Sequence, residues 1–436
     1  MSQPATRGTP NEGLTASTLG FFFGFAAVAL FGPTAKEFKD LMGLTPAQVG
    51  LLVAAPSLSG SLLRIPFSAW VDTTGGRKPF LVLLGTSVVG MAGLVVVMYT
   101  AYPDNVTPGV YPVLLLLGVL SGSGIATFSV GISQVSYWFP QSRQGWALGT
   151  YAGAGNLAPG LFSFLLPLVL AGAGLPVAYV AWLGLLVIGT YLYWQMGQNA
   201  PYFQLRQQGV SADQARVQAA RTGEELFPAG TARQTLAISA RNWKTWALVV
   251  LYFTTFGGFI ALTAWLPTYW REFHGASAFA AGTLTAVFSL LASVLRIVGG
   301  SIADRIGGES TAIVSLTLLL AGATVMMFSD GLVVSVLAEI VMAAGMGVNN
   351  AAVFKLVPQE VPEAVGGAAG WVGGLGAFGG FAVPPLMGTF VRGEQLSGYA
   401  TGFVVLVVLA LVSLAVAYWL RRHARHPQFV PSPPTS

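Results

Sequence analysis

The sequence predicts an all-α membrane protein with twelve transmembrane helices in two pseudo-symmetric six-helix bundles and both termini in the cytoplasm. Three observations lead to this fold class. The chain is 54% hydrophobic and only 8% charged, with a mean hydropathy of +0.68, whereas soluble domains are about one quarter charged. Apolar stretches follow one another from Leu14 to Leu420. Finally, two segments of the chain repeat each other at an offset of 232 residues.

A membrane-spanning helix needs about 20 mostly apolar residues, and twelve such stretches are present, rich in Gly and Ala as packed membrane helices are. They lie near residues 15–35, 46–71, 78–101, 109–137, 145–172, 175–197, 244–270, 277–302, 309–329, 331–357, 364–391 and 398–421. The longest polar stretch, residues 198–243, separates six spans from six. We call it the connector and expect it to be a cytoplasmic tether that contains a surface helix. The predicted division of the chain is a tail at 1–13, a bundle at 14–197, the connector, a bundle at 244–421 and a tail at 422–436.

The distribution of charge predicts the orientation, because cytoplasmic loops retain Lys and Arg. With the N-terminus inside, fifteen of the 21 basic residues fall on the cytoplasmic side. Those expected outside are Lys36, Lys39, Arg271 and Arg392. This topology accounts for the net charge of +5, so nucleic-acid binding is not expected.

Cysteine is absent, which rules out disulfides and thiolate metal sites, and the three histidines are not clustered in the spans. We therefore expect no metal and no cofactor. The short polar start leads directly into a multi-span chain, so a cleaved signal peptide is not expected. The prediction is a monomeric, multi-pass protein of the plasma membrane.

An internal repeat relates the two halves of the chain. RIPFSAWVDTTGG at 64–76 aligns without gaps with RIVGGSIADRIGG at 296–308, and the Arg, Ile, Asp and both Gly coincide. GWALGTYAGAG at 145–155 similarly aligns with the segment that starts at Gly366. Halves related by a parallel repeat predict a substrate site at their interface, near the midplane, reached alternately from each side. This symmetry is typical of transporters rather than enzymes.

The two repeated arginines are predicted to lie deep in the membrane. Asp72 and Asp304 should mark the cytoplasmic ends of the second and eighth spans, and each arginine, Arg64 or Arg296, precedes its aspartate by eight residues. At 1.5 Å per residue they lie about 12 Å inside a core roughly 30 Å thick. Two buried guanidinium groups repel each other unless an anion lies between them. Glu339 alone cannot neutralise both.

A mobile anion is the simplest missing charge, and the planar fork of arginine suits a planar oxyanion. The alternative is that each arginine bonds carbonyl groups within its own bundle. Other side chains expected near this depth could enclose a flat ion with rings or donate hydrogen bonds to it, although each could also serve packing alone. They are Phe25, Phe128, Asn156, Tyr252, Phe256, Asn349 and Asn350.

Several motifs carry a family resemblance. D-x-x-G-G-R-K at 72–78 and D-R-I-G-G at 304–308 resemble the signature loop of the major facilitator superfamily, with the motif residues Asp72, Gly75, Arg77, Asp304 and Gly307. The arginine pair, the strings AGAGNLAPG and GGLGAFGG, and NNAAVFKLVP at 349–358 make the whole chain similar to the NarK-type nitrate/nitrite porters.

The resemblance implies that Arg64 and Arg296 hold nitrate or nitrite and that Phe128, Tyr252 and Phe256 border the site. It gives the role of nitrate signature to Asn156 and to glycines of the fifth and eleventh spans. These glycines are Gly153, Gly155, Gly374, Gly376, Gly379 and Gly380. The chain departs from the pattern at Ser68, at Glu309 and at the Ala158-Pro159 pair.

Two questions stay open at this level. An exchanger of phosphate or of an organic anion such as an organic phosphate would also need paired positive charge, although no additional Lys or His is visible near the midplane. Coupling is either exchange of nitrate for nitrite, which needs no titrating group, or symport with protons, for which Glu339 and Lys355 are the candidates. An enzyme is not expected, because the spans lack a nucleophile, a metal cluster and an acid/base pair.

Overall fold

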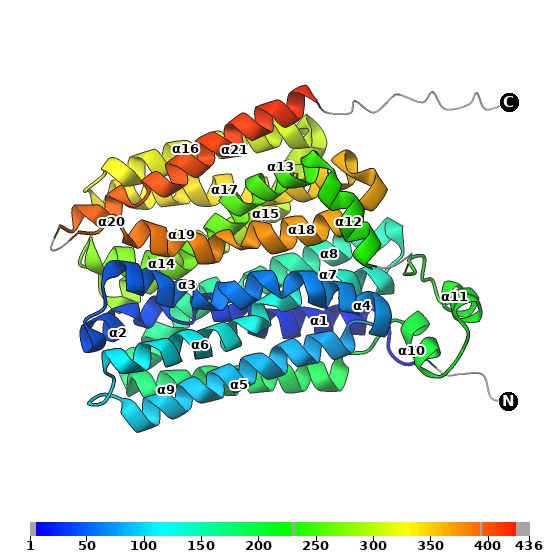
Figure 1. Cartoon of the computed structure of the whole chain (residues 1–436), viewed down its shortest axis with the longest axis horizontal. Helices are drawn as coiled ribbons and strands as arrows, with labels where there is room; N and C mark the ends of the chain where they lie inside the picture. Colours follow the sequence, from blue (N-terminus) through cyan, green and yellow to red (C-terminus); the bar gives the residue numbers. More distant parts are fainter. Residues whose placement is uncertain (1–5, 229–231, 393–394, 424–436) are drawn as a thin grey trace.

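The computed structural model describes residues 6–228, 232–392 and 395–423, and within them every regular element is helical. Figure 1 shows the first nine helices packed together in the lower half of the view and the helices from α13 onward in the upper half. The first group comprises α1 (Pro10–Phe25), α2 (Ala35–Met42), α3 (Pro46–Leu62), α4 (Arg64–Thr74), α5 (Arg77–Ala101), α6 (Tyr111–Gly122), α7 (Thr127–Trp138), α8 (Gln141–Asn156) and α9 (Ala158–Met196). The second group comprises α13 (Trp243–Tyr252), α14 (Gly258–Glu272), α15 (Ala278–Ile306), α16 (Gly308–Phe328), α17 (Leu332–Glu360), α18 (Val365–Ala377), α19 (Gly379–Gly388), α20 (Ser397–Thr401) and α21 (Val404–Arg422).

Ten helical segments of the described residues are long and apolar enough to cross a membrane. One of them, Trp146–Met196, bends sharply inside α9 at Gly174, whose φ of +81° is open to glycine and strained for other residues. The consecutive helices α18 and α19 form a further apolar path. When the two limbs of α9 are counted separately and the α18–α19 path is added, the ten segments are consistent with the twelve predicted spans.

Helix α1 begins at Pro10, five residues before the predicted start of the first span. Thr9 and Glu12 form a capping box there, in which each side chain accepts a hydrogen bond from the other residue's backbone N–H. The helical path then continues through the short 3₁₀ turns η1 (Ala26–Ala29) and η2 (Gly32–Thr34) into α2. A local polar cap therefore extends this helix beyond the apolar stretch that predicts it.

Several spans are interrupted in their middle. α3 gives way to α4 next to Arg64, α8 to α9 next to Asn156, and α18 to α19 next to Gly379. Between α13 and α14 the chain forms a π-helical turn, η5 (Phe253–Gly257), and between α6 and α7 a 3₁₀ turn, η4 (Ser123–Ala126). Irregular backbone is tolerated at this depth only inside the protein, and π turns are frequent at functional sites. The interruptions lie within the spans of both halves.

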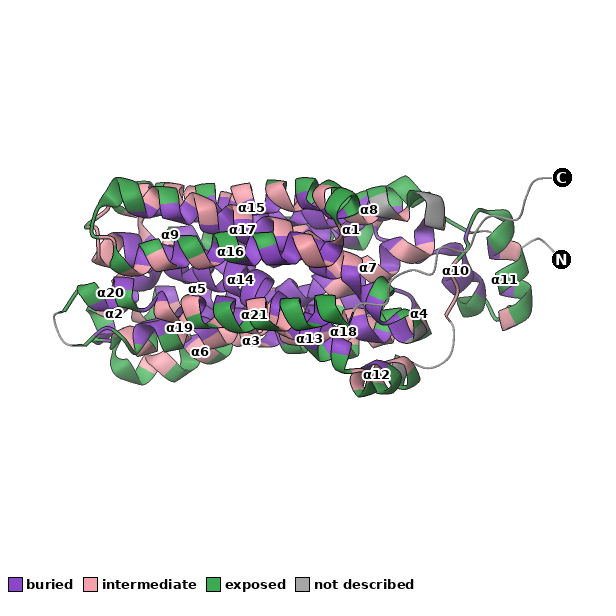
Figure 2. Ribbon diagram, turned by 90° about the horizontal axis from the view of Figure 1, so that it is seen from above, coloured by how far each residue is buried: buried purple, intermediate pink, exposed green. Residues whose placement is uncertain are grey.

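Burial separates inner helices from outer ones. Of the most apolar window in α13–α14, 89% is buried inside the protein, against 33% in α20–α21. Figure 2 shows buried residues along the middle of the molecule and exposed stripes on outer helices such as α21. α13 and α14 therefore lie at the centre, whereas α21 presents a large apolar face of the kind that lipid covers.

The connector forms three short helices, α10 (Pro201–Gln207), α11 (Ala212–Arg221) and α12 (Ala232–Arg241), at one end of the molecule. Charge distribution predicts this end to be cytoplasmic, and we call it the cytoplasmic end and its opposite the external end. α10 packs on the first bundle, where the Phe203 and Tyr137 rings meet edge to face at 5.0 Å. α12 packs on α18, where the indole N–H of Trp371 donates to the Leu236 carbonyl at 3.1 Å. The connector thus contacts both groups of helices.

Candidate arginine site between the two bundles

Arg64 is fully buried at the start of α4. Its Nε donates to the Gly60 carbonyl at 3.0 Å, within its own bundle, and its Nη1 donates to the Gly373 carbonyl of α18 at 3.1 Å. Its Nη2 is buried and has no hydrogen-bond partner. Two carbonyl groups from opposite bundles therefore fix the plane of the guanidinium, and one nitrogen keeps its N–H groups free.

Arg296, in the middle of α15, faces the same rings as Arg64. The Arg64 guanidinium carbon lies 4.9 Å from the centre of the Phe128 ring and 5.2 Å from that of Phe256, and for Arg296 these distances are 5.7 and 5.4 Å. Nη1 of Arg296 is buried and has no partner. In the described part of the chain, neither arginine forms an ion pair with a carboxylate. The predicted meeting of the two arginines is present in the structure.

The aromatic residues form one layer around the pair. Tyr252 stacks on Phe256 with ring centres 4.7 Å apart, and the ring of Phe25 is nearly parallel to that of Phe256 at 6.4 Å. Phe128 lies 6.0 Å from Phe256. The hydroxyl of Tyr252 is buried without a partner. The electron-rich ring faces hold the two cations, and the hydroxyl provides one more potential donor.

Phe354 completes this layer, and the sequence analysis did not single it out. Its ring centre lies 5.8 Å from the Arg296 guanidinium carbon and 5.0 Å from the Tyr252 ring, which it meets edge to face. It sits one helical turn after Asn350 on α17, within the NNAAVFKLVP motif. The i+4 spacing from Asn350 was the signal that could have identified it.

The three candidate asparagines are buried, and the side-chain amide oxygen of each has no hydrogen-bond partner. They are Asn156, Asn349 and Asn350. The Nδ2 group of Asn349 donates to Thr255 Oγ1 in the π turn at 3.0 Å. The backbone carbonyl of Asn156 accepts a hydrogen bond from Ser293 Oγ at 3.0 Å, three residues before Arg296. Asn156 therefore joins the end of α8 to the helix that carries the second arginine.

The predicted signature glycines allow close packing around this layer. A Cβ atom at Gly376 would lie 2.7 Å from the Tyr252 ring, and one at Gly379 would lie 2.5 Å from the Phe253 carbonyl oxygen. At Gly155 it would overlap the ring of Phe21. The other three meet isoleucines at 2.6 to 3.2 Å: Gly153 with Ile297, Gly374 with Ile65 and Gly380 with Ile260.

The motif residues lie apart from the arginine pair, at the cytoplasmic end. Asp72 accepts a hydrogen bond from the Tyr137 hydroxyl at 2.7 Å, and Gly75 and Gly307 have φ of +78° and +87°. Asp304 pairs with Lys355 at 2.8 Å. Lys355 also donates to the Ala303 carbonyl at 2.6 Å, so its charge joins α17 to the end of α15.

Glu339 lies elsewhere again, fully buried on α17, and neither of its carboxyl oxygens has a hydrogen-bond partner. The indole of Trp270 is near it, outside hydrogen-bonding geometry. Glu339 is not among the side chains that contact either arginine. Of the two candidate coupling residues, neither joins the site itself.

A cavity of about 390 Å³ leads from the arginine site toward the cytoplasmic end. Its inner wall includes Phe128, Phe354 and Gly373, and further along α4 and α7 it is lined by hydroxyl groups. These belong to Ser68, Ser129, Ser133 and Ser136. Four connector residues line the mouth, namely Leu226, Phe227, Thr235 and Leu236. The cavity therefore reaches the aromatic layer, at Phe128 and Phe354, from the cytoplasmic end.

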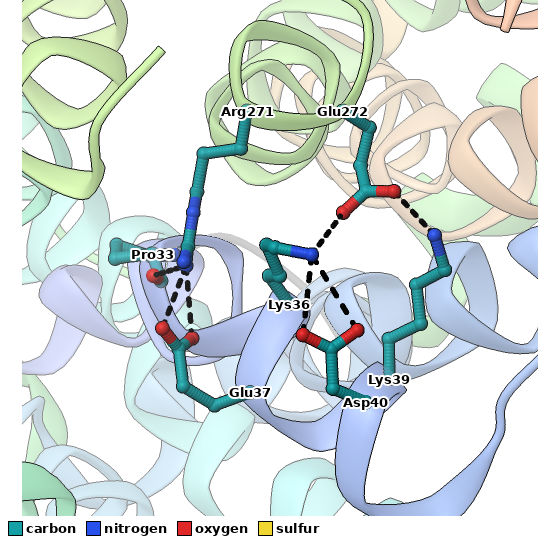
Figure 3. A network of polar contacts seen from close by, with 7 residues as sticks. All are labelled: Pro33, Lys36, Glu37, Lys39, Asp40, Arg271 and Glu272. Atoms are coloured by element: carbon teal, nitrogen blue, oxygen red, sulfur yellow. Dashed lines mark hydrogen bonds and ion pairs between the residues drawn. The ribbon is translucent and has the colours of Figure 1, made fainter. Parts of the chain in front are cut away.

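The external end is closed by ion pairs between α2 and α14 (Figure 3). Arg271 donates to both oxygens of Glu37 at 2.8 and 2.9 Å. Glu272 pairs with Lys36 at 3.2 Å and also with Lys39. We call these residues the external ion-pair layer. α3 and α19 also pack closely at this end, where a Cβ at Gly50 would lie 2.5 Å from the Pro384 carbonyl oxygen.

Comparisons with known proteins agree with this architecture. The family model described as Major Facilitator Superfamily matches residues 17–384. Among solved structures, a D-xylose-proton symporter superposes with a TM-score of 0.73 at 13% identity, covering 96% of this chain and 98% of the symporter. At that identity the likeness shows the fold alone.

Curated relatives are more similar in sequence. The "Probable nitrate/nitrite antiporter NarK1" of Thermus thermophilus is 31% identical, with 95% of this chain and 93% of the relative aligned. The "Probable nitrate/nitrite transporter NarK2" of Mycobacterium tuberculosis strain H37Rv is 30% identical over 92% of this chain and 94% of its own length. The chain, a multi-pass transporter of the plasma membrane and not an enzyme, therefore belongs to the major facilitator superfamily and to its NarK-type nitrate/nitrite porter family.

Proposed function

We propose that this protein transports nitrate and nitrite by alternating access and binds the anion between Arg64 and Arg296. The observation that carries the proposal is the pair of buried guanidinium groups, which share the faces of Phe128 and Phe256 and have no carboxylate partner among the described residues. Each keeps a buried nitrogen without a partner, Nη2 in Arg64 and Nη1 in Arg296. Two like charges at this depth are stabilised when an anion joins them.

The geometry favours a small monoanion with planar oxygens. Guanidinium N–H groups lie in a plane and match two oxygens at once, and the surrounding rings exclude water without adding further charge. A dianion such as phosphate would call for more positive charge, and the lining of the cavity contributes Asp72 rather than another cation. Relatives named as nitrate/nitrite transporters support the same substrate class.

We further propose that the coupling is exchange of nitrate for nitrite. Lys355 is engaged by Asp304, and Glu339 does not contact the arginine pair, so the site itself contains two permanent cations and no acid or base. Nitrate and nitrite carry the same charge. One can therefore replace the other between the arginines without any proton being moved.

The test is uptake of labelled nitrate into proteoliposomes in three loadings: nitrite inside, phosphate inside, and empty vesicles with an inward proton gradient. Exchange predicts uptake only with internal nitrite, at a rate at least about tenfold above the other two. Uptake driven by the proton gradient alone would replace exchange by symport and direct attention to Glu339. Stimulation by phosphate, or no nitrate uptake under any loading, would contradict the substrate assignment.

A further inference from the structure

A second hollow, of about 470 Å³, lies at the cytoplasmic end, between the start of α5 and the end of α9. It shares no lining residue with the cavity that leads to the arginine pair. Its lining residues are Arg77, Lys78, Leu81, Val82, Trp194, Asn199 and Gln207. The proposed transport function does not use it.

Two cations line this hollow and lack acidic partners. Arg77 Nη2 donates to the Trp194 carbonyl at 2.8 Å, whereas its Nε is buried without a partner. Lys78 Nζ lies 5.7 Å from the centre of the Trp70 ring. Within the described residues neither cation forms an ion pair, and the lining itself contains no carboxylate. The hollow therefore has unused capacity to bind negative charge.

The remaining wall is apolar and faces outward. Val82 follows Lys78 by one helical turn and is 40% exposed, and Trp194 is 51% exposed. Both lie on the outer surface of membrane-spanning helices, near the end of the apolar stretch, where aromatic side chains commonly mark the boundary between lipid tails and head groups. The hollow thus joins a cationic part at head-group depth to an apolar part that faces the lipid tails.

The internal repeat shows that the loop does not itself require these cations. At an offset of 232 residues, Arg77 and Lys78 correspond to Glu309 and Ser310, while Val82 corresponds to Val314. The turn is preserved in both copies, since Gly75 and Gly307 both have positive φ. Only the first bundle has two cations after the turn, next to the apolar wall. Because the second bundle forms the same turn without them, Arg77 and Lys78 must serve something other than the turn.

We propose that this hollow binds an anionic phospholipid, with the phosphate between Arg77 and Lys78 and an acyl chain along Val82 and Trp194. Basic pockets on the cytoplasmic side of membrane helices are suited to anionic head groups, and the apolar wall adds what a free phosphate would not use. The bound lipid would join α5 to α9. It would also join both helices to Asn199. The side chain of Asn199 accepts a hydrogen bond from the Arg77 backbone N–H at 2.9 Å and donates one to the Thr74 carbonyl at 3.1 Å.

The experiment measures lipid binding to the purified full-length protein. Native mass spectrometry and thermal unfolding are recorded with phosphatidylglycerol and, separately, with phosphatidylcholine. The test variant is Arg77→Gln/Lys78→Gln. The matched control is Arg421→Gln/Arg422→Gln, which removes two exposed cations from the same end of the molecule. We expect phosphatidylglycerol to bind and to raise the Tm of the wild type and the control, and the test variant to bind it about 30-fold more weakly.

Two further arms keep the result decisive. The single variant Lys78→Gln changes an exposed side chain and should fold even if the double variant does not; it is expected to bind phosphatidylglycerol about fivefold more weakly. Inorganic phosphate is the second arm, and stabilisation by phosphate equal to that by phosphatidylglycerol would identify a free anion site instead. Equal binding of phosphatidylglycerol by the test variants and the control would overturn the proposal.

Discussion

At the scale of single residues, the behaviour of Arg64 follows from how its five N–H groups are used. Nε and Nη1 are held by carbonyl groups at 3.0 and 3.1 Å, and these bonds orient the plane of the guanidinium. Nη2 is left without a partner in a buried position, which is costly for a charged group. The same side chain is therefore both held in a fixed plane and left with N–H groups free to bind an anion. Substrate binding should depend on the shape of the guanidinium as well as on its charge.

We predict that Arg64→Lys or Arg296→Lys weakens nitrate binding roughly 10- to 100-fold, the loss expected for one charge-assisted hydrogen bond. Lysine keeps the charge but cannot bond two carbonyl groups and the anion in one plane. The measurement is nitrate binding by calorimetry, with thermal unfolding to confirm that each variant folds. Arg305→Lys, an exposed change on the same helix as Arg296, is the control. Wild-type affinity in both site variants would contradict the two-arginine site.

The depth of individual site residues could be predicted by counting along helices, whereas their neighbours could not. Arg64, Arg296, Phe128 and Phe256 meet as the spacing indicated. The Gly373 carbonyl that holds Arg64 lies 309 residues away in the chain, and no periodicity reports such a contact. Lys355 was a candidate for coupling because it is a charge in an apolar helix, and only the structure shows the ion pair with Asp304.

At the scale of elements, the apolar stretches located the spans but not their interruptions. The break beside Gly379 lies within one continuous apolar stretch, and hydropathy does not mark it. It arises where backbones approach closely, as at Gly257, where a Cβ would lie 2.6 Å from the Gly376 carbonyl oxygen. Hydropathy describes partition between water and lipid, and it is insensitive to packing between two helices inside the protein.

The connector, which the sequence predicted to be a tether, also lines the mouth of the cavity. Glu224, two residues before Leu226, is buried, and its carboxyl accepts a hydrogen bond from the Tyr202 backbone N–H at 3.1 Å. Phe227 meets the Tyr202 ring edge to face at 5.6 Å. Burial raises the pKa of the Glu224 carboxyl from 4.5 to about 7, although the hydrogen bond from Tyr202 opposes this shift.

We predict that docking of this segment on α10 weakens as pH rises. The docked carboxyl keeps its proton up to about pH 7, whereas a released one loses it near pH 4.5. Docking is therefore strongest below about pH 4.5, weakens through the interval and levels off above about pH 7. Hydrogen exchange of residues 224–227, corrected for the intrinsic rate, should be slower at about pH 5 than at about pH 8. Glu224→Gln should remove the difference, and Asp213→Asn on α11 should retain it; a difference that survives Glu224→Gln would assign it to another group.

At the scale of the whole molecule, the two ends of the transport path differ. The external ion-pair layer joins α2 to α14 across the two bundles, and the cavity opens toward the opposite end. The sequence placed Lys39 and Arg271 outside, but their acidic partners, Glu272 and Glu37, lie more than 230 positions away in the chain. The structure is therefore closed by ion pairs at the external end and hollowed as far as Phe128 and Phe354 at the cytoplasmic end.

We predict that Arg271→Gln/Glu272→Gln, which removes every ion pair of this layer between the bundles, shifts the protein toward external opening. The chain has no cysteine, so Ser57→Cys, a buried position on α3 beside Gly380 of α19, can be labelled without background. Its modification by an impermeant thiol reagent from outside should be at least about fivefold faster in the double variant, since partly exposed ion pairs contribute up to about 1 kcal/mol each.

The control is Asp40→Asn, which alters only a contact within α2 and should leave the rate of modification unchanged. Equal rates in the parent, the double variant and the control would mean that helix packing alone keeps the external end closed.

The bend at Gly174 has a consequence for how the protein enters the membrane. The two limbs of α9 meet there without an intervening polar loop, and no charged side chain occurs between Arg143 and Arg206. For the insertion machinery this stretch is a single apolar hairpin, so no hydrophilic segment has to be translocated when its turn reaches the far leaflet. The cationic residues that border it, Arg143 and Arg206, are then the fixed points that retain both ends of the hairpin on the side of synthesis.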